Sequence, residues 1–98
     1  MENTADLRLS CIAAFLDRIQ PNVRLIKIRK EAKSITVTVV LDTELLPNQL
    51  DLIQVATAEI IADFPDCNMI KEDIKVSRSR IEREGHIQSG WIYRRYED

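Results

Sequence analysis

The sequence has very few of the residues on which most catalytic and phosphate-binding motifs depend. It contains one histidine, His86, and only two glycines, Gly85 and Gly90. So few glycines exclude the glycine-rich loop that cradles phosphate groups. No serine, cysteine or carboxylate stands at a diagnostic spacing from the histidine, so the sequence offers no catalytic triad. We therefore predict no catalytic residue and no enzyme activity.

Cysteine is equally scarce, and its placement argues against metals and disulfides. Cys11 and Cys67 form no CxxC pair, and the acidic residues match no calcium-binding loop, so we predict neither a metal site nor a cofactor. Isolated thiols are typical of a reducing compartment. The first residues are acidic where a secretory signal would be basic, and Asp17 and Arg18 interrupt the first apolar stretch. These features predict a cytoplasmic protein that has no membrane-spanning segment.

The remaining composition is that of a folded domain. Hydrophobic residues make up 45% and charged residues 31% of the 98 residues, a balance far from that of disordered or disulfide-rich chains. A chain of this length is large enough for one hydrophobic core and too small for two. We predict a single domain over residues 1–98.

Prolines and hydrophobic spacing predict two helices. Residues 5–19 carry apolar side chains at helical spacing, and Pro21 prevents the helix from continuing. A second helix over residues 47–64 begins at Pro47 and is stopped by Pro65. The inward side chains of the first helix are expected to be Cys11, Ile12, Phe15, Leu16 and Ile19. Those of the second are expected to be Leu50, Ile53, Ala56, Thr57, Ile60, Ile61 and Phe64.

Alternating segments predict four strands. Residues 23–30 and 34–41 are rich in β-branched side chains, and the EAK segment between them is expected to form a tight hairpin. Alternation in 34–41 is typical of an antiparallel strand that is covered on one face; the covered side chains are Ile35, Val37, Val39 and Leu41. Residues 74–78 and 91–96 predict a second hairpin. The order α-β-β-α-β-β indicates an α+β fold, a two-layer sandwich with two helices packed on one face of a mainly antiparallel four-stranded sheet.

Charge is segregated along the chain. Residues 42–73 contain eight acidic side chains and one base, Lys71, for a formal charge of −7, whereas the rest of the chain is net basic. On the second helix Glu59 and Asp63 stand four residues apart, and with Asp66 they crowd the negative end of the helix dipole, which lowers stability. The acids form either a solvated face that promotes solubility or a surface that binds a cationic partner. The candidate partner-binding acids are Asp51, Glu59, Asp63, Asp66, Glu72 and Asp73.

Basic residues accumulate on the predicted strands and support a second interpretation. The first hairpin carries Arg24, Lys27, Arg29, Lys30 and Lys33, and the second carries Arg78, Arg80, Arg83, Arg94 and Arg95. With Trp91, Tyr93 and Tyr96 between them, these cations could follow phosphates and stack on bases. Such cations also protect sheet edges from aggregation, and a net charge of −2 argues against a dedicated nucleic-acid-binding protein. A nucleic-acid-binding adaptor therefore remains the alternative function.

Three segments together resemble a known class of proteins. They are TAEIIADFPD, IKEDI and the terminal GWIYRRYED, all within residues 55–98. This part of the chain is similar to the small cytoplasmic immunity proteins of bacterial contact-dependent growth inhibition and related polymorphic-toxin systems. The resemblance implies a non-catalytic inhibitor that binds one cognate toxin domain, often a basic nuclease, and blocks its active site.

The resemblance and the charge pattern lead to the same functional hypothesis. We predict that the acidic surface docks on a cationic toxin domain, because complementary charge steers two proteins together. Trp91, Tyr93 and Tyr96 belong either to the core or to the surface; if they are exposed, they are candidate anchors of the same interface, because aromatic residues dominate interface energetics. No membrane or cofactor is expected to take part.

Overall fold

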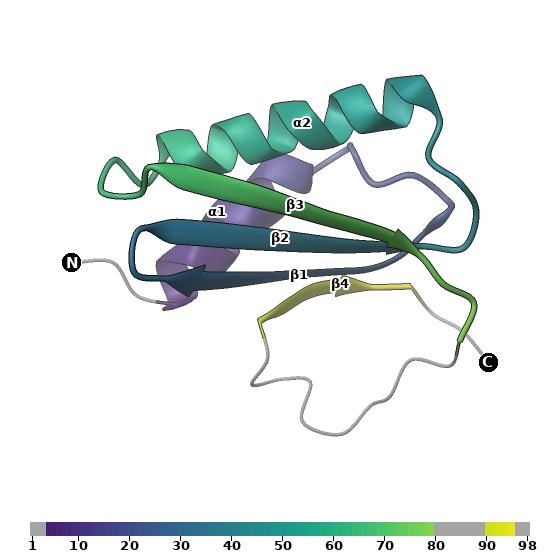
Figure 1. Cartoon of the computed structure of the whole chain (residues 1–98), viewed down its shortest axis with the longest axis horizontal. Coiled ribbons are helices and arrows are strands. Elements are labelled where there is room, and N and C mark those ends of the chain that lie inside the picture. Colours follow the sequence, from purple (N-terminus) through teal and green to yellow (C-terminus); the bar gives the residue numbers. More distant parts are fainter. Residues whose placement is uncertain (1–3, 80–89, 96–98) are drawn as a thin grey trace.

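The computed structural model describes residues 4–79 and 90–95, and within them it contains two helices and four strands (Figure 1). In chain order they are α1 (Thr4–Phe15), β1 (Val23–Glu31), β2 (Ser34–Leu41), α2 (Pro47–Ala62), β3 (Met69–Val76) and β4 (Trp91–Arg94). Side chains of both helices and of the sheet face beneath them form one buried cluster. The predicted α+β sandwich, with both helices on one side of the sheet, is confirmed.

The sheet is mixed, with strand order β3-β2-β1-β4. β1 and β2 form the expected antiparallel hairpin, β4 joins the other edge of β1 antiparallel, and β3 runs parallel to β2. The sheet is thus antiparallel in two of its three strand pairs, and the prediction that residues 34–41 belong to an antiparallel sheet is wrong only for the pairing of β2 with β3. The predicted second hairpin is wrong, because β3 and β4 lie at opposite edges of the sheet (Figure 1). α2 returns the chain across the sheet, so β3 starts at the same end as β2, as in any crossover connection.

The core confirms the predicted faces of β2 and α2. Ile35, Val37, Val39 and Leu41 are each at most 1% exposed. On α2 the buried residues are Gln49, Ile53, Ala56, Thr57 and Ile60, followed by Phe64 after the helix. Leu50 and Ile61, also expected inside, are only partly buried. β3 begins five residues before the predicted start and turns Ile70, Glu72 and Ile74 inward.

α1 differs most from the prediction. It ends at Phe15, and Asp17 adopts a left-handed conformation with φ of 64°, so the helix stops well before Pro21. Its buried side chains are Leu7, Cys11, Ala14 and Phe15. Ile12 and Leu16, predicted to be buried, are exposed, and Ile19 is partly buried. Because the helix carries apolar residues nearly all around its circumference, their spacing did not determine which side packs on the sheet.

β4 approaches β1 closely at Gly90. The Ile28 N–H donates a hydrogen bond of 2.9 Å to the Gly90 carbonyl. Gly90 has a φ of +75°, and a Cβ atom there would lie 2.1 Å from the Ile28 carbonyl oxygen, so only glycine fits. Gly85 and His86 lie outside the described residues.

Candidate interaction surface

Glu59 lies on the exposed side of α2 and is held by Arg18, in the turn that follows α1. The Arg18 guanidinium donates a hydrogen bond of 2.8 Å to Glu59 Oε1. This bond lowers the pKa of Glu59 and raises that of Arg18, while nearby Asp63 acts on Glu59 in the opposite direction. The Glu59 side chain is still 50% exposed, so the carboxylate is oriented by the fold and accessible to a partner.

The other two acids at this end of α2 also have partners within the fold. Asp63 accepts a hydrogen bond of 2.6 Å from the Ser10 hydroxyl of α1. Asp66, in the turn after α2, lies 3.6 Å from the Lys30 ammonium of β1. The repulsion inferred from the sequence is therefore partly offset by groups that come from α1 and β1. Within the described part of the chain, only one oxygen of Asp63 accepts a hydrogen bond.

The remaining candidate acids lie elsewhere. Asp51 is exposed in the N-terminal half of α2. Glu72 on β3 is partly buried and accepts a short hydrogen bond from Thr57 of α2. Asp73 is exposed and lies on the opposite face of the sheet, where it neighbours Lys75 at 3.5 Å. The structure thus brings together Glu59, Asp63 and Asp66 and separates the other three from them.

The aromatic candidates do not gather beside these acids. Tyr93 on β4 is paired with Ile26 and packs against the core. Trp91 is partly buried on the other face of the sheet, where the Arg94 guanidinium lies 6.0 Å from the centre of its ring. Tyr96 lies outside the described residues. Neither Trp91 nor Tyr93 shares the surface formed by the end of α2.

The sheet face opposite the helices is basic. The residues of β2 that point to this face are Thr36, Thr38 and Val40. The residues that pair with them on β1 and β3 point to the same face. The cations of this face are Lys27, Arg29, Lys71, Lys75 and Arg94, and its acids are Glu31 and Asp73. Arg80 and Arg83, which the sequence placed on a second basic hairpin, lie outside the described residues. The cations of this face come from β1, β3 and β4, rather than from two hairpins.

An ion pair that the sequence did not reveal joins the residue after β4 to the residue after β2, beside the start of β1. Arg95, just after β4, donates hydrogen bonds of 2.8 Å to Asp42 Oδ2 and to the Pro21 carbonyl. The Arg95 hydrogen bond holds the pKa of Asp42 below its ordinary value. Arg78 adds a hydrogen bond of 3.0 Å to the Asp42 carbonyl. Asp42 is therefore a structural acid, although its position in the acidic segment had suggested no such role.

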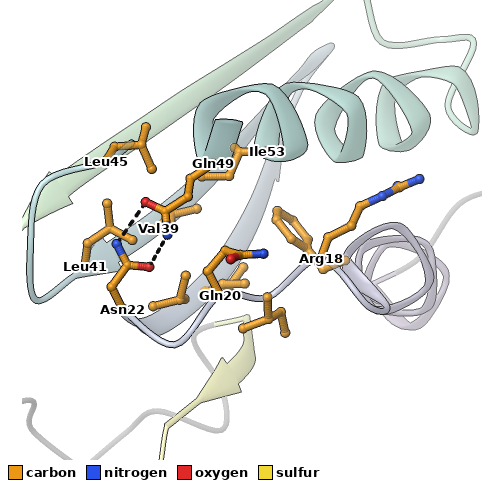
Figure 2. A pocket seen from close by; sticks show the side chains of 12 residues that line it. Arg18, Gln20, Asn22, Val39, Leu41, Leu45, Gln49 and Ile53 are labelled. Carbon is orange, nitrogen blue, oxygen red and sulfur yellow. Dashed lines mark hydrogen bonds between the residues drawn. The ribbon is translucent and has the colours of Figure 1, made fainter. Parts of the chain in front are cut away.

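A small hollow lies between α2, the loop before β1 and the sheet (Figure 2). At its rim the Asn22 and Gln49 amides exchange two hydrogen bonds, of 3.1 and 2.8 Å, and Gln49 Oε1 also accepts from the Leu46 N–H. The space in which the centre of a water molecule fits is about 10 Å³. That is room for roughly one water molecule, so this hollow suits no substrate or cofactor.

The described residues offer little for metal or redox chemistry. Among residues 4–79 and 90–95, no three His, Cys, Asp or Glu side chains are placed to hold a metal ion. Cys11 and Cys67 are both buried thiols, and burial raises the pKa of Cys11 to about 12, which keeps it unreactive. In the same part of the chain, no helix has the length and apolar character needed to cross a membrane.

Comparison with known sequences identifies one family. A sequence model described as MafI2 immunity protein matches residues 4–97, which include every helix and strand of the fold. No curated protein matches the chain.

Proposed function

Because the chain belongs to the MafI2 immunity protein family, we propose that it is a cytoplasmic, non-catalytic inhibitor that binds one cognate toxin domain. The toxin that we propose is a basic nuclease domain of a contact-dependent growth inhibition or related polymorphic-toxin system. Inhibition then depends on one-to-one binding, because the protein itself transforms no substrate.

The arrangement of Glu59 and Asp63 is the observation that supports an acidic docking surface. Both carboxylates are exposed, Glu59 in the last turn of α2 and Asp63 directly after the helix, and each is oriented by a single side chain of the α1 region. Fixed acids of this kind complement a basic protein surface, and they raise the rate at which the two proteins meet. Asp66 extends the same acidic edge beyond the helix.

The neighbouring gene provides the test. We expect an adjacent reading frame for a large secreted protein, and we expect its C-terminal domain to arrest growth when it is expressed alone in the cytoplasm. Co-expression of the present chain should restore growth, and the purified proteins should form a one-to-one complex. A toxin domain from an unrelated system is the control, because an immunity protein protects only against its own toxin. Failure to bind or to protect would overturn the proposal.

The basic sheet face keeps one alternative open. Five cations and Trp91 on one surface would suit a nucleic-acid-binding adaptor. Family membership favours the immunity function, and direct measurement of binding to RNA and DNA distinguishes the alternative.

A further inference from the structure

α1 presents three large apolar side chains to solvent. Leu9 is 64% exposed, Ile12 is 44% exposed, and Leu16, directly after the helix, is 68% exposed. Their spacing of three and four residues places them on one side of the helix. These three residues are called the α1 stripe below. Soluble proteins expose isolated apolar side chains routinely, but several large ones on one side of a helix often mark an interaction site.

The fold itself does not need the α1 stripe. α1 packs on the sheet and on α2 through Leu7, Cys11, Ala14 and Phe15, which are all less than 5% exposed. The stripe lies on the opposite side of the helix and makes no part of the buried core. Polar residues at its three positions would preserve the core, so the apolar character of the stripe calls for another explanation.

Acidic groups border the α1 stripe on the side of α2. Ser10 of α1 faces α2, because its hydroxyl donates to Asp63, and Arg18 faces Glu59. Asp17 is exposed immediately after Leu16. Arg18 is already engaged by Glu59. Three carboxylates, those of Asp17, Glu59 and Asp63, stand against this one guanidinium. The border is therefore net acidic, and it complements Lys or Arg side chains on a partner.

The bordering carboxylates are held in place before any partner arrives. Arg18 fixes Glu59, and Ser10 fixes Asp63, so binding would cost less side-chain entropy than it would with free carboxylates. An apolar centre with an ordered polar border is the usual anatomy of a specific protein interface. A second copy of this chain would bring an equal acidic border, whereas a basic protein surface would complement it.

We propose that the α1 stripe is the apolar centre of the toxin-binding surface and that Glu59 and Asp63 are its acidic border. The partner surface is then an apolar patch edged with Lys or Arg on the toxin domain. This inference rests on the proposed function and adds to it the element that makes the central contact. It shifts the interface from α2 alone to α1 together with the adjacent edge of α2.

The test compares two variants that remove exposed apolar side chains at different places. The first replaces the α1 stripe by Leu9→Gln, Ile12→Gln and Leu16→Gln. The control replaces Met69→Gln and Val76→Thr on β3, whose side chains are 50% and 49% exposed. Both variants are expected to keep the circular dichroism spectrum of the wild type. Binding is measured by calorimetry with the inactivated C-terminal toxin domain of the neighbouring gene.

We expect the stripe variant to bind that domain about 100-fold more weakly and the control to bind within about threefold of wild type. Equal affinity of the stripe variant and the wild type would overturn this inference and leave the immunity function intact. If the wild type does not bind the domain, the proposed function itself fails. Should the triple variant unfold, the single Leu16→Gln change, at the most exposed of the three positions, gives the same comparison.

The remaining explanation is that a second copy of this chain covers the α1 stripe, and sedimentation equilibrium tests it. If the wild type is a dimer that the stripe variant converts to a monomer, and toxin affinity does not change, a second copy covers the stripe and the inference is wrong. A monomeric wild type together with weaker toxin binding by the stripe variant supports it.

Discussion

The guanidinium of Arg18 lies 2.8 Å from the carboxylate of Glu59, which is 41 residues further along the chain. The same nitrogen of Arg18 also donates to the Ala14 carbonyl at the end of α1. One side chain thus completes the C-terminal end of α1 and fixes an acid on α2. The carboxylate of Glu59 is therefore an ordered part of the fold, because Arg18 links it to the end of α1.

Removing two of these charges should affect association more than folding. The double variant Glu59→Gln and Asp63→Asn is expected to keep a melting temperature close to that of the wild type, because the amides still accept hydrogen bonds from Arg18 and Ser10. Its association rate with the toxin domain should fall about tenfold, and the rate should depend less on salt. Stopped-flow mixing at several ionic strengths measures both effects. Glu31→Gln with Glu44→Gln removes the same charge at exposed positions elsewhere, and an equal slowing in that control would contradict the assignment.

The Asp42–Arg95 pair predicts how stability depends on acidity. The pKa of Asp42 lies below its ordinary value of 3.8 in the folded protein, so the unfolded chain takes up a proton first as the pH falls. The contribution of this pair is present above that ordinary value and is lost as the pH drops through the lower folded value. Thermal melts from about pH 7 to about pH 3 should show a smaller acid-induced decrease for Arg95→Gln than for the wild type. Arg29→Gln on β1 serves as control, and a wild-type response in Arg95→Gln would show that Asp42 titrates without the pair.

The amide pair at the start of α2 should contribute to stability. Gln49→Leu leaves the Asn22 amide and the Leu46 N–H without their partner in a site where Gln49 is only 7% exposed. Leaving partly buried polar groups unsatisfied costs about 2 kcal/mol. Urea denaturation measures the loss. Gln54→Leu, at an exposed position of α2, should change the free energy of unfolding little, and equal losses in the two variants would show that the pair is not stabilising.

Nucleic-acid binding should be weak despite the basic sheet face. We expect dissociation constants above about 10⁻⁶ M for mixed RNA and duplex DNA at about 0.15 M salt, within or weaker than the range of ordinary non-specific binding. Fluorescence anisotropy with labelled oligonucleotides measures them. Tighter, salt-sensitive binding that is lost in a Lys27→Gln and Lys71→Gln variant would favour the adaptor function instead.

Local sequence patterns predicted the parts of the fold that depend on local geometry. The alternation in residues 34–41 gave the correct inward face, because a strand places successive side chains on opposite sides whatever its neighbours are. The same alternation could not give the direction of the partner strand. β3 pairs with β2 in parallel, and that depends on where α2 delivers the chain.

The sequence likewise predicted only part of the candidate site. The spacing of Glu59 and Asp63 correctly predicted that both are exposed at the end of α2, but their partners Arg18 and Ser10 lie 41 and 53 residues away. Contacts over such separations leave no local pattern in a single sequence. The packing side of α1 was missed for another reason: apolar residues surround that helix, so Leu16 was predicted inside and is 68% exposed.

The two charged layers give the molecule an electric dipole. Glu59, Asp63 and Asp66 lie with the helices, the cations of the opposite sheet face lie beyond them, and the molecule is only 20 Å thick along its shortest axis. A basic surface that approaches would exert a torque on this dipole and turn the helices towards itself. Because ionic screening at physiological salt acts over about 8 Å, the rotation would occur in the last moments before contact, when orientation decides whether an encounter becomes a complex.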